Sequence, residues 1–116
     1  MTVKECYEAL GADYEEVMNR LRKEERVQRF LKKLLDDKTY ALLSTSLQTG
    51  NMEEAFRAAH TLKGVSQNLS LKNLYVPASC LSDCLKERRE YTEEVETLFE
   101  KVKEEYIRTT EAIKQL

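Results

Sequence analysis

The chain has 116 residues, of which 34% are charged and 41% hydrophobic, with three glycines, one proline and no tryptophan. This length suits a single domain with one hydrophobic core, and so few glycines and prolines exclude the many tight turns of a β-sandwich or barrel. The formal net charge of −2 lacks the basic excess of a general nucleic-acid-binding protein. The composition therefore predicts one all-α domain over residues 1–116, and the single histidine becomes the residue to explain.

Short helices are predicted at the N-terminus. Residues 3–10 form a helix that ends at Gly11, which suits the left-handed conformation of a C-terminal cap. Asp13 is a typical N-cap for a second helix over residues 14–22. Apolar side chains at helical spacing predict a third helix over residues 24–36. The second and third helices could also be one bent helix.

The rest of the chain predicts four longer helices joined by short connections. These helices cover residues 40–49, 52–68, 70–86 and 92–113. Short connections favour antiparallel neighbours, so we expect an up-and-down four-helix bundle with one or two short extra N-terminal helices. A turn is expected at residues 88–90. Pro77 lies inside the third long helix and should kink it or mark a late start.

The sequence has no strong signal for a membrane segment or for a metal site. The N-terminus has no apolar segment typical of a signal peptide, and the longest apolar runs of about four residues are too short to span a bilayer. The three cysteines, Cys6, Cys80 and Cys84, are expected to be reduced thiols. Cys80 and Cys84 share a helix face, but no CxxC pair or second histidine accompanies them, so we expect no metal site. We expect a cytoplasmic protein with no membrane or nucleic-acid partner.

His60 lies in the middle of the predicted helix over residues 52–68. At 3.6 residues per turn, the apolar side chains of this segment fall on an arc about 140° to 260° away from His60. These side chains are Ala55, Ala58, Ala59, Leu62, Val65 and Leu69. Glu53, Lys63, Gly64 and Gln67 fall within about 60° of His60 instead. The pattern predicts that His60 faces solvent and that the back of its helix is buried in the bundle.

The neighbours of His60 suit a nucleophile whose product is anionic. Lys63 lies one turn later and can bring its ammonium near a group attached to the imidazole. Gly64 costs the helix about 0.5–1 kcal/mol relative to alanine, and clearing space beside the ring would explain that cost. An exposed imidazole is mostly neutral and nucleophilic at pH 7, and a phosphoryl group on it would carry charge that Lys63 can pair with. A surface histidine beside an incidental lysine and glycine remains the alternative at this point.

The segment Ala58-Ala59-His60-Thr61-Leu62-Lys63-Gly64 resembles the AHxLKG signature of histidine-containing phosphotransfer (HPt) domains of two-component phosphorelays. The resemblance extends upstream through residues 50–55 and downstream through Leu69 and Leu74. It implies an antiparallel four-helix bundle with the active histidine on a solvent-facing flank. One residue departs from the family pattern, because many members carry a glycine where this chain has Ser70. We expect Ser70 to cap the following helix and to change the turn without loss of function.

The resemblance also implies a role for each residue near His60. His60 would be the phosphoacceptor through Nε2, Lys63 would assist electrostatically, and Gly64 would provide clearance. Gln67 would contact the ring or the phosphoryl group. Phe56 lies one turn before His60 on its flank, where it could be a docking contact or could pack against a neighbouring helix.

The implied function is that of a phosphorelay intermediate. It would accept a phosphoryl group from a receiver-domain aspartyl phosphate and pass it reversibly to another receiver, with receiver domains or a hybrid histidine kinase as partners. Such a chain is not an enzyme with its own ATP site, and no glycine-rich nucleotide loop is present in the sequence. No cofactor is expected on this chain, because the receiver would hold the Mg²⁺. We expect a monomer.

Two other readings of the sequence stay open. The first is a helical adaptor module that keeps the bundle without phosphoryl chemistry. The second is a metal-binding four-helix bundle, which would need inward-facing ligands, whereas His60 is predicted to face outward. Met18, Leu21 and Leu31 are candidates for completing a docking surface around His60.

Overall fold

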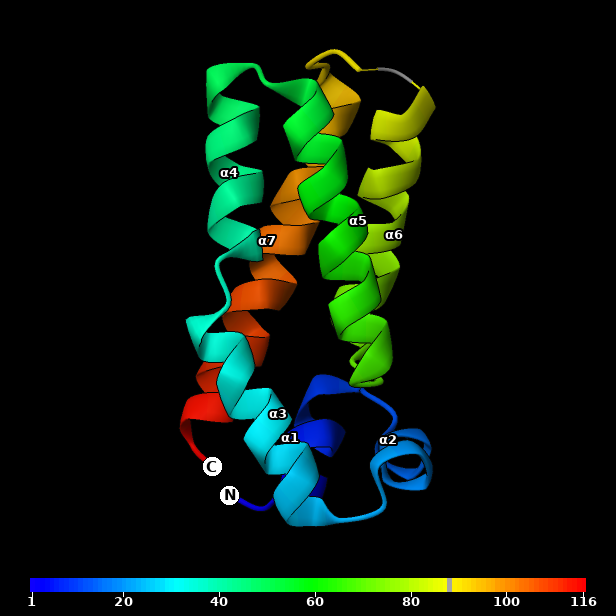
Figure 1. Cartoon of the computed structure of the whole chain (residues 1–116), viewed down its shortest axis with the longest axis vertical. Helices are drawn as coiled ribbons and strands as arrows, with labels where there is room; N and C mark the ends of the chain where they lie inside the picture. Colours follow the sequence, from blue (N-terminus) through cyan, green and yellow to red (C-terminus); the bar gives the residue numbers. More distant parts are fainter. Residues whose placement is uncertain (88) are drawn as a thin grey trace.

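A computed structural model describes residues 1–87 and 89–116, which form seven helices and no strand (Figure 1). The helices are α1 (Val3–Leu10), α2 (Tyr14–Leu21), α3 (Glu24–Asp36), α4 (Thr39–Thr49), α5 (Met52–Asn68), α6 (Lys72–Glu87) and α7 (Glu93–Lys114). The predicted all-α class is confirmed. Position 88 of the predicted turn lies outside the described residues.

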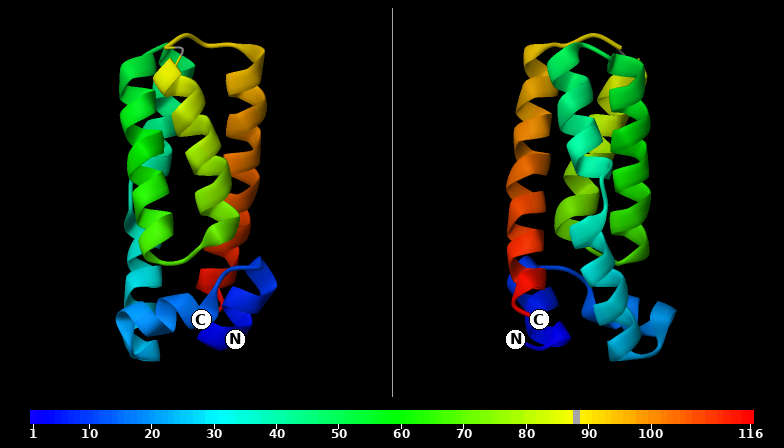
Figure 2. Two further views of the ribbon diagram at one scale, coloured as in Figure 1. Left: turned by 90° about the vertical axis from the view of Figure 1, so that its right-hand side faces the viewer. Right: turned by 60° about the vertical axis from the view of Figure 1, so that its left-hand side comes forward.

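Helices α4 to α7 form an antiparallel bundle in which α5 lies between α4 and α6, and α6 lies beside α7 (Figures 1 and 2). Helix α3 precedes α4 along the same side of the molecule, and α1 and α2 lie at the end of the bundle where both chain termini are found. The molecule measures 41 × 21 × 19 Å. The predicted bundle with short N-terminal helices is therefore confirmed.

Backbone conformation separates the N-terminal helices. Gly11 ends α1 with a φ of 67°, and the Asp13 side chain accepts a hydrogen bond from the Glu16 amide at 3.0 Å to start α2. Arg22 has a φ of 73°, which is incompatible with a continuing right-handed helix. The second and third helices are therefore distinct rather than one bent helix.

The buried side of α5 is built from small and branched side chains. Ala55, Ala58, Ala59 and Leu62 are at most 3% exposed, as the helical wheel predicted. Ser66 is also buried, and its hydroxyl donates to the Leu62 carbonyl at 2.8 Å, so that burial leaves no unpaired hydroxyl. The small alanine side chains let α5 pack closely between α4 and α6. This packing fixes the rotation of α5 about its own axis.

Helix α6 passes through Pro77 and does not begin there. The Leu71 carbonyl accepts hydrogen bonds from the Leu74 and Tyr75 amides at 3.0 and 2.8 Å, so the first turn is complete before the proline. The Pro77 ring is buried with the apolar face of the helix. The alternative of a late helix start at Pro77 is wrong.

The N-terminal helices hold the C-terminal end of α5. The buried Tyr7 hydroxyl of α1 donates to the Leu69 carbonyl at 2.6 Å. From α2, Arg20 Nη1 donates to the carbonyl oxygens of Gln67 and Asn68 at 2.9 and 2.8 Å. The last carbonyls of a helix lack partners within the helix and carry partial negative charge, so a guanidinium is well suited to bind them. The end of α5 is thereby fixed to α1 and α2.

Ser70 contributes to the same junction, which corrects the prediction that it caps α6. It is buried and has a φ of 54°, in the left-handed region that favours glycine. Its hydroxyl donates to Glu16 Oε1 at 2.8 Å and accepts from Arg20 Nη1 at 3.1 Å. The side chain is therefore used for contacts to α2, and these contacts help a non-glycine residue hold this conformation.

A buried carboxylate joins α6 to α7. Glu105 is 4% exposed and accepts hydrogen bonds from Asn73 Nδ2 at 3.0 Å and Arg108 Nη1 at 2.6 Å. Burial alone would raise the pKa of this carboxyl, but the Asn73 hydrogen bond and the charges of Arg108 and Lys101 outweigh it, so that the pKa is lowered. The ionised form of Glu105 therefore stabilises the folded state.

We predict that Glu105→Gln lowers the free energy of unfolding at pH 7 by about 1–2 kcal/mol, because it removes a charged hydrogen-bond acceptor from a buried network. The folded-state pKa lies below the ordinary value of 4.5, so this contribution is present above about pH 4.5 and is lost as the pH falls through the folded-state pKa. Urea denaturation from pH 7 to pH 3 should show the wild type and the variant converging. A difference that stays constant with pH would contradict this account.

Candidate functional site

His60 projects from the middle of α5 into solvent. Its side chain is exposed, whereas its chain neighbour Ala59 and nearby Ala58 are buried. Among the described residues, no hydrogen bond or ion pair involves the imidazole. The sequence-based expectation of an outward-facing histidine is confirmed.

Phe56 packs beside His60. The centres of the two rings are 6.0 Å apart and their planes are tilted by 31°. Phe56 is half-buried and packs against the hydrophobic core, so one part of its ring supports the bundle while another remains accessible. The sequence left two roles open for Phe56, a docking contact or packing against the bundle. This placement is compatible with both.

Lys63 and Gln67 lie further along the same face of α5. Lys63 is half-buried, and among the described residues no carboxylate lies within ion-pair distance of its ammonium. Gln67 is exposed, and its backbone carbonyl accepts the Arg20 hydrogen bond described above. An imidazole and an ammonium therefore lie about one turn apart on one helix, and this arrangement suits an anion added to the ring.

Gly64 lies beside His60 at a position where a side chain would meet no obstacle. A Cβ atom placed on it has no neighbouring atom within 4 Å. Packing within the chain therefore does not require glycine here, although glycine weakens a helix interior. Clearance for an approaching molecule remains a physical reason for its presence.

A mostly apolar groove flanks the C-terminal half of α5. It has a volume of about 380 Å³ and lies between α5, α2 and α3. Its apolar lining residues are Leu21, Phe30, Leu34, Val65 and Leu69, and its polar ones are Arg20, Lys33, Asp37 and Asn68. The Phe30 side chain is 38% exposed, with the Lys33 ammonium 5.3 Å from the centre of its ring. This groove is an accessible surface for an apolar side chain of another protein.

The residues that line this groove differ from the three docking candidates that the sequence suggested. Leu21 lines it, but Leu31 is fully buried and cannot contact a partner. Met18 is half-buried against the core and does not line the groove. Sequence reasoning missed Phe30, although its place at the edge of the apolar stripe, beside Arg29 and Lys33, is typical of a partly exposed side chain.

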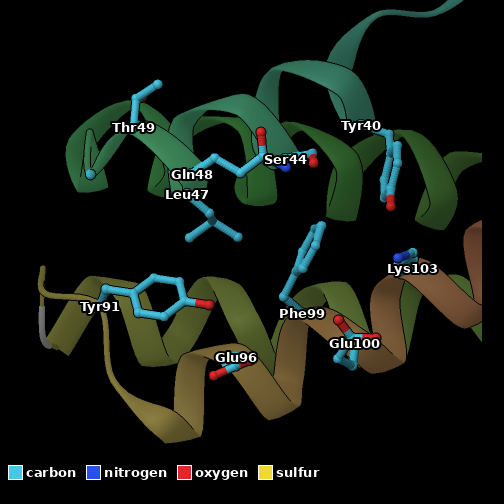
Figure 3. Close-up of a pocket in the computed structure, with 11 residues that line it drawn as sticks. Tyr40, Ser44, Leu47, Gln48, Thr49, Tyr91, Glu96, Phe99, Glu100 and Lys103 are labelled. Carbon is cyan, nitrogen blue, oxygen red and sulfur yellow. The ribbon is translucent and has the colours of Figure 1, made fainter.

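A second hollow, a cleft of about 620 Å³, lies between α4 and α7 (Figure 3). Its walls carry Tyr40 and Phe99, whose stacked rings have centres 5.9 Å apart, together with Leu47 and Tyr91. No residue of α5 lines this cleft. His60 therefore lies on an exposed helix face and lines neither this cleft nor the groove.

Three other features of the described residues concern membrane-spanning helices, metal-binding groups and cysteine chemistry. Within residues 1–87 and 89–116, no helix is both long and apolar enough to cross a membrane, and no group of three or more potential ligand side chains could hold a metal ion. Cys6 is buried, and burial raises the pKa of its thiol. Cys80 is exposed and Cys84 is half-buried.

The chain matches the family model of the Hpt domain over residues 15–115. This match covers most of the chain, and the protein therefore belongs to the Hpt domain family. Hpt domains carry phosphoryl groups on a histidine in phosphorelays and interact there with receiver domains and histidine kinases. They are phosphotransfer carriers rather than kinases. No curated protein and no solved structure matches the chain.

We predict that Gly64→Ala stabilises the protein by about 0.5–1 kcal/mol, because the added methyl group meets no atom and the helix gains a better helix former. Urea denaturation followed by circular dichroism measures this change. Destabilisation would show that Gly64 is required by packing within the chain.

Proposed function

We propose that this protein is a phosphorelay intermediate in which His60 is the phosphoacceptor. The observation that carries the proposal is the exposed imidazole of His60, within the family signature, on a helix whose opposite face is buried. We place this relay step in the cytoplasm, with receiver domains or a hybrid histidine kinase as partners and the chain acting as a monomer.

The proposed reaction begins with an aspartyl phosphate on a receiver domain. The Nε2 lone pair of His60 attacks phosphorus in line with the bond to the aspartyl oxygen. The N–P bond forms as the P–O bond breaks, and aspartate leaves as a carboxylate. The ring, which carries its proton on Nδ1 before attack, gives that proton to solvent or keeps it as an imidazolium. The reverse reaction returns the phosphoryl group to a receiver.

The residues around His60 support this chemistry in different ways. Lys63 provides a positive charge near the phosphoryl oxygens, and Gly64 leaves room for the receiver to approach the ring. Gln67 is exposed on the same face and would contact the ring or the phosphoryl group. The chain needs no cofactor of its own for this step, because the receiver supplies Mg²⁺ with its aspartate.

Docking would use two partly exposed aromatic residues, Phe56 of α5 and Phe30 of α3. Phe56 lies towards the start of α5, and the groove that contains Phe30 lies towards its end. A receiver that docks over His60 and extends across the exposed Asn68 to the groove would cover both. Such apolar contacts exclude water, and they hold the phosphorus in line with Nε2.

An adaptor that uses the same surface without phosphoryl transfer is the alternative function. It would bind receivers but would not require the imidazole. Transfer and binding assays on the same variant therefore distinguish the two functions.

We predict that the wild type, mixed with a phosphorylated receiver, gains one acid-labile and base-stable phosphate, and that His60→Gln abolishes this labelling while the fold is retained. The reason is that the exposed His60 side chain contributes the nucleophile but little packing. Labelling is measured by phosphate-affinity electrophoresis and folding by circular dichroism. Equal labelling of both proteins would exclude His60 as the acceptor, and receiver binding without labelling of the wild type would support the adaptor.

We also predict that Phe30→Asp slows transfer from the receiver by about tenfold, because it places a charge in an apolar groove that the receiver covers. The matched control is Ile107→Asp, since Ile107 is 48% exposed on α7. Transfer rates are measured in a rapid-quench assay, with urea denaturation as a check on folding. Equal rates for the two variants would remove this groove from the docking surface.

A further inference from the structure

Arg89, in the connection between α6 and α7, reaches the face of α5 that carries His60. Its guanidinium carbon lies 4.6 Å from the centre of the Phe56 ring, which is a cation–π contact. The same ring also lies beside the imidazole of His60, at 6.0 Å between centres. Phe56 therefore contacts both the guanidinium of Arg89, which is distant in sequence, and the imidazole of His60.

Charge effects on α5 agree with this placement. The pKa of the Glu53 carboxyl is lowered, chiefly by its hydrogen bond to Arg57 and the charge of Arg57, and further by the charge of Arg89. The two arginines nevertheless differ in their availability. Arg57 is paired with Glu53 at 2.8 Å and Glu54 at 3.6 Å. Within the described residues, Arg89 has no carboxylate within ion-pair distance, and it is exposed.

We propose that Arg89 is a second phosphoryl-binding cation of this site, acting together with Lys63. The proposal rests on the proposed function of His60. Phe56 lies one turn before His60 and Lys63 lies about one turn after it, so the two cations approach the ring from opposite ends along the helix. When His60 carries a phosphoryl group, the guanidinium moves from the Phe56 ring to the phosphoryl oxygens.

The energetic reason is a competition between two contacts of the same guanidinium. A cation–π contact at an exposed position is weak, whereas a guanidinium binds a doubly charged phosphoryl group through two parallel, charge-assisted hydrogen bonds. In the unphosphorylated protein the Phe56 ring keeps Arg89 close, which reduces the entropy lost on pairing. The arginine thus favours the phosphorylated state and the ionised form of the phosphoryl group.

The test uses the full chain, phosphorylated on His60 by the small-molecule donor phosphoramidate, so that receiver docking plays no part. The ³¹P chemical shift followed against pH gives the midpoint at which the phosphoryl group gains a proton. We expect Arg89→Gln to raise this midpoint by about 0.3–0.5 pH units, because a neighbouring cation favours the dianion. Arg89→Lys should lie closer to the wild type, and Lys63→Ala should raise the midpoint as well. Lys114→Gln, which removes an exposed charge at the C-terminal end of α7, is the control and should leave the midpoint unchanged.

A second measurement is the distribution of phosphate at equilibrium with a receiver. Arg89→Gln should shift this distribution towards the receiver by about two- to threefold, as expected from a similar change in free energy. Circular dichroism and urea denaturation should match the wild type, since Arg89 is exposed.

The outcomes separate this proposal from the proposed function. If the wild type accepts no phosphoryl group on His60 from either donor, the proposed function fails. If the wild type is phosphorylated but Arg89→Gln titrates like the wild type, the role of Arg89 is overturned and that of His60 stands. A change in transfer from the receiver without a change in the ³¹P midpoint would likewise overturn phosphoryl binding by Arg89, and would make it a docking residue.

Discussion

The packing of the alanine-rich side of α5 between α4 and α6 is the constraint on which the site depends. Ala55, Ala58 and Ala59 are almost fully buried, and a rotation of the helix would expose them and force His60 or Lys63 into the core. Burying an unpaired cation or imidazole is costly, so only one rotation of α5 is compatible with a well-packed bundle. The same burial that stabilises the bundle therefore presents the histidine to solvent.

The N-terminal helices add a second constraint, on the end of α5. Arg20 binds the last carbonyls of the helix and Tyr7 binds the following one, so the helix end cannot fray without loss of these contacts. Helices α2 and α3 also form the groove that contains Phe30. The elements that hold α5 in place thus also form a groove along its C-terminal half. This arrangement suits the proposed function, in which a fixed helix would present the nucleophile and the neighbouring surface would dock the partner.

Much of this arrangement follows from periodicity in the sequence. The outward direction of His60 and the buried face of α5 were predicted from a helical wheel, since both depend only on residues within one helix. Ser70 could not be understood in this way, because its conformation depends on contacts with Glu16 and Arg20, which are distant in sequence. Leu31 and Phe30 are adjacent on one apolar stripe, and which of them is buried depends on how α3 packs against other helices. The approach of Arg89 to Phe56 depends on the path of a connection, which leaves no periodic signal.

The measurement that tests the central claim most directly is the location and reversibility of the phosphoryl group on the full chain. Wild-type protein would be exposed to a phosphorylated receiver and followed by intact mass and ³¹P NMR, and unphosphorylated receiver would then be added. If His60 is the phosphoacceptor, the chain gains one phosphate with the ³¹P resonance of an Nε2-phosphohistidine, and this resonance disappears when the second receiver is added. A phosphate bound through serine, threonine or tyrosine oxygen, or a protein that binds receivers and gains no phosphate, would contradict it.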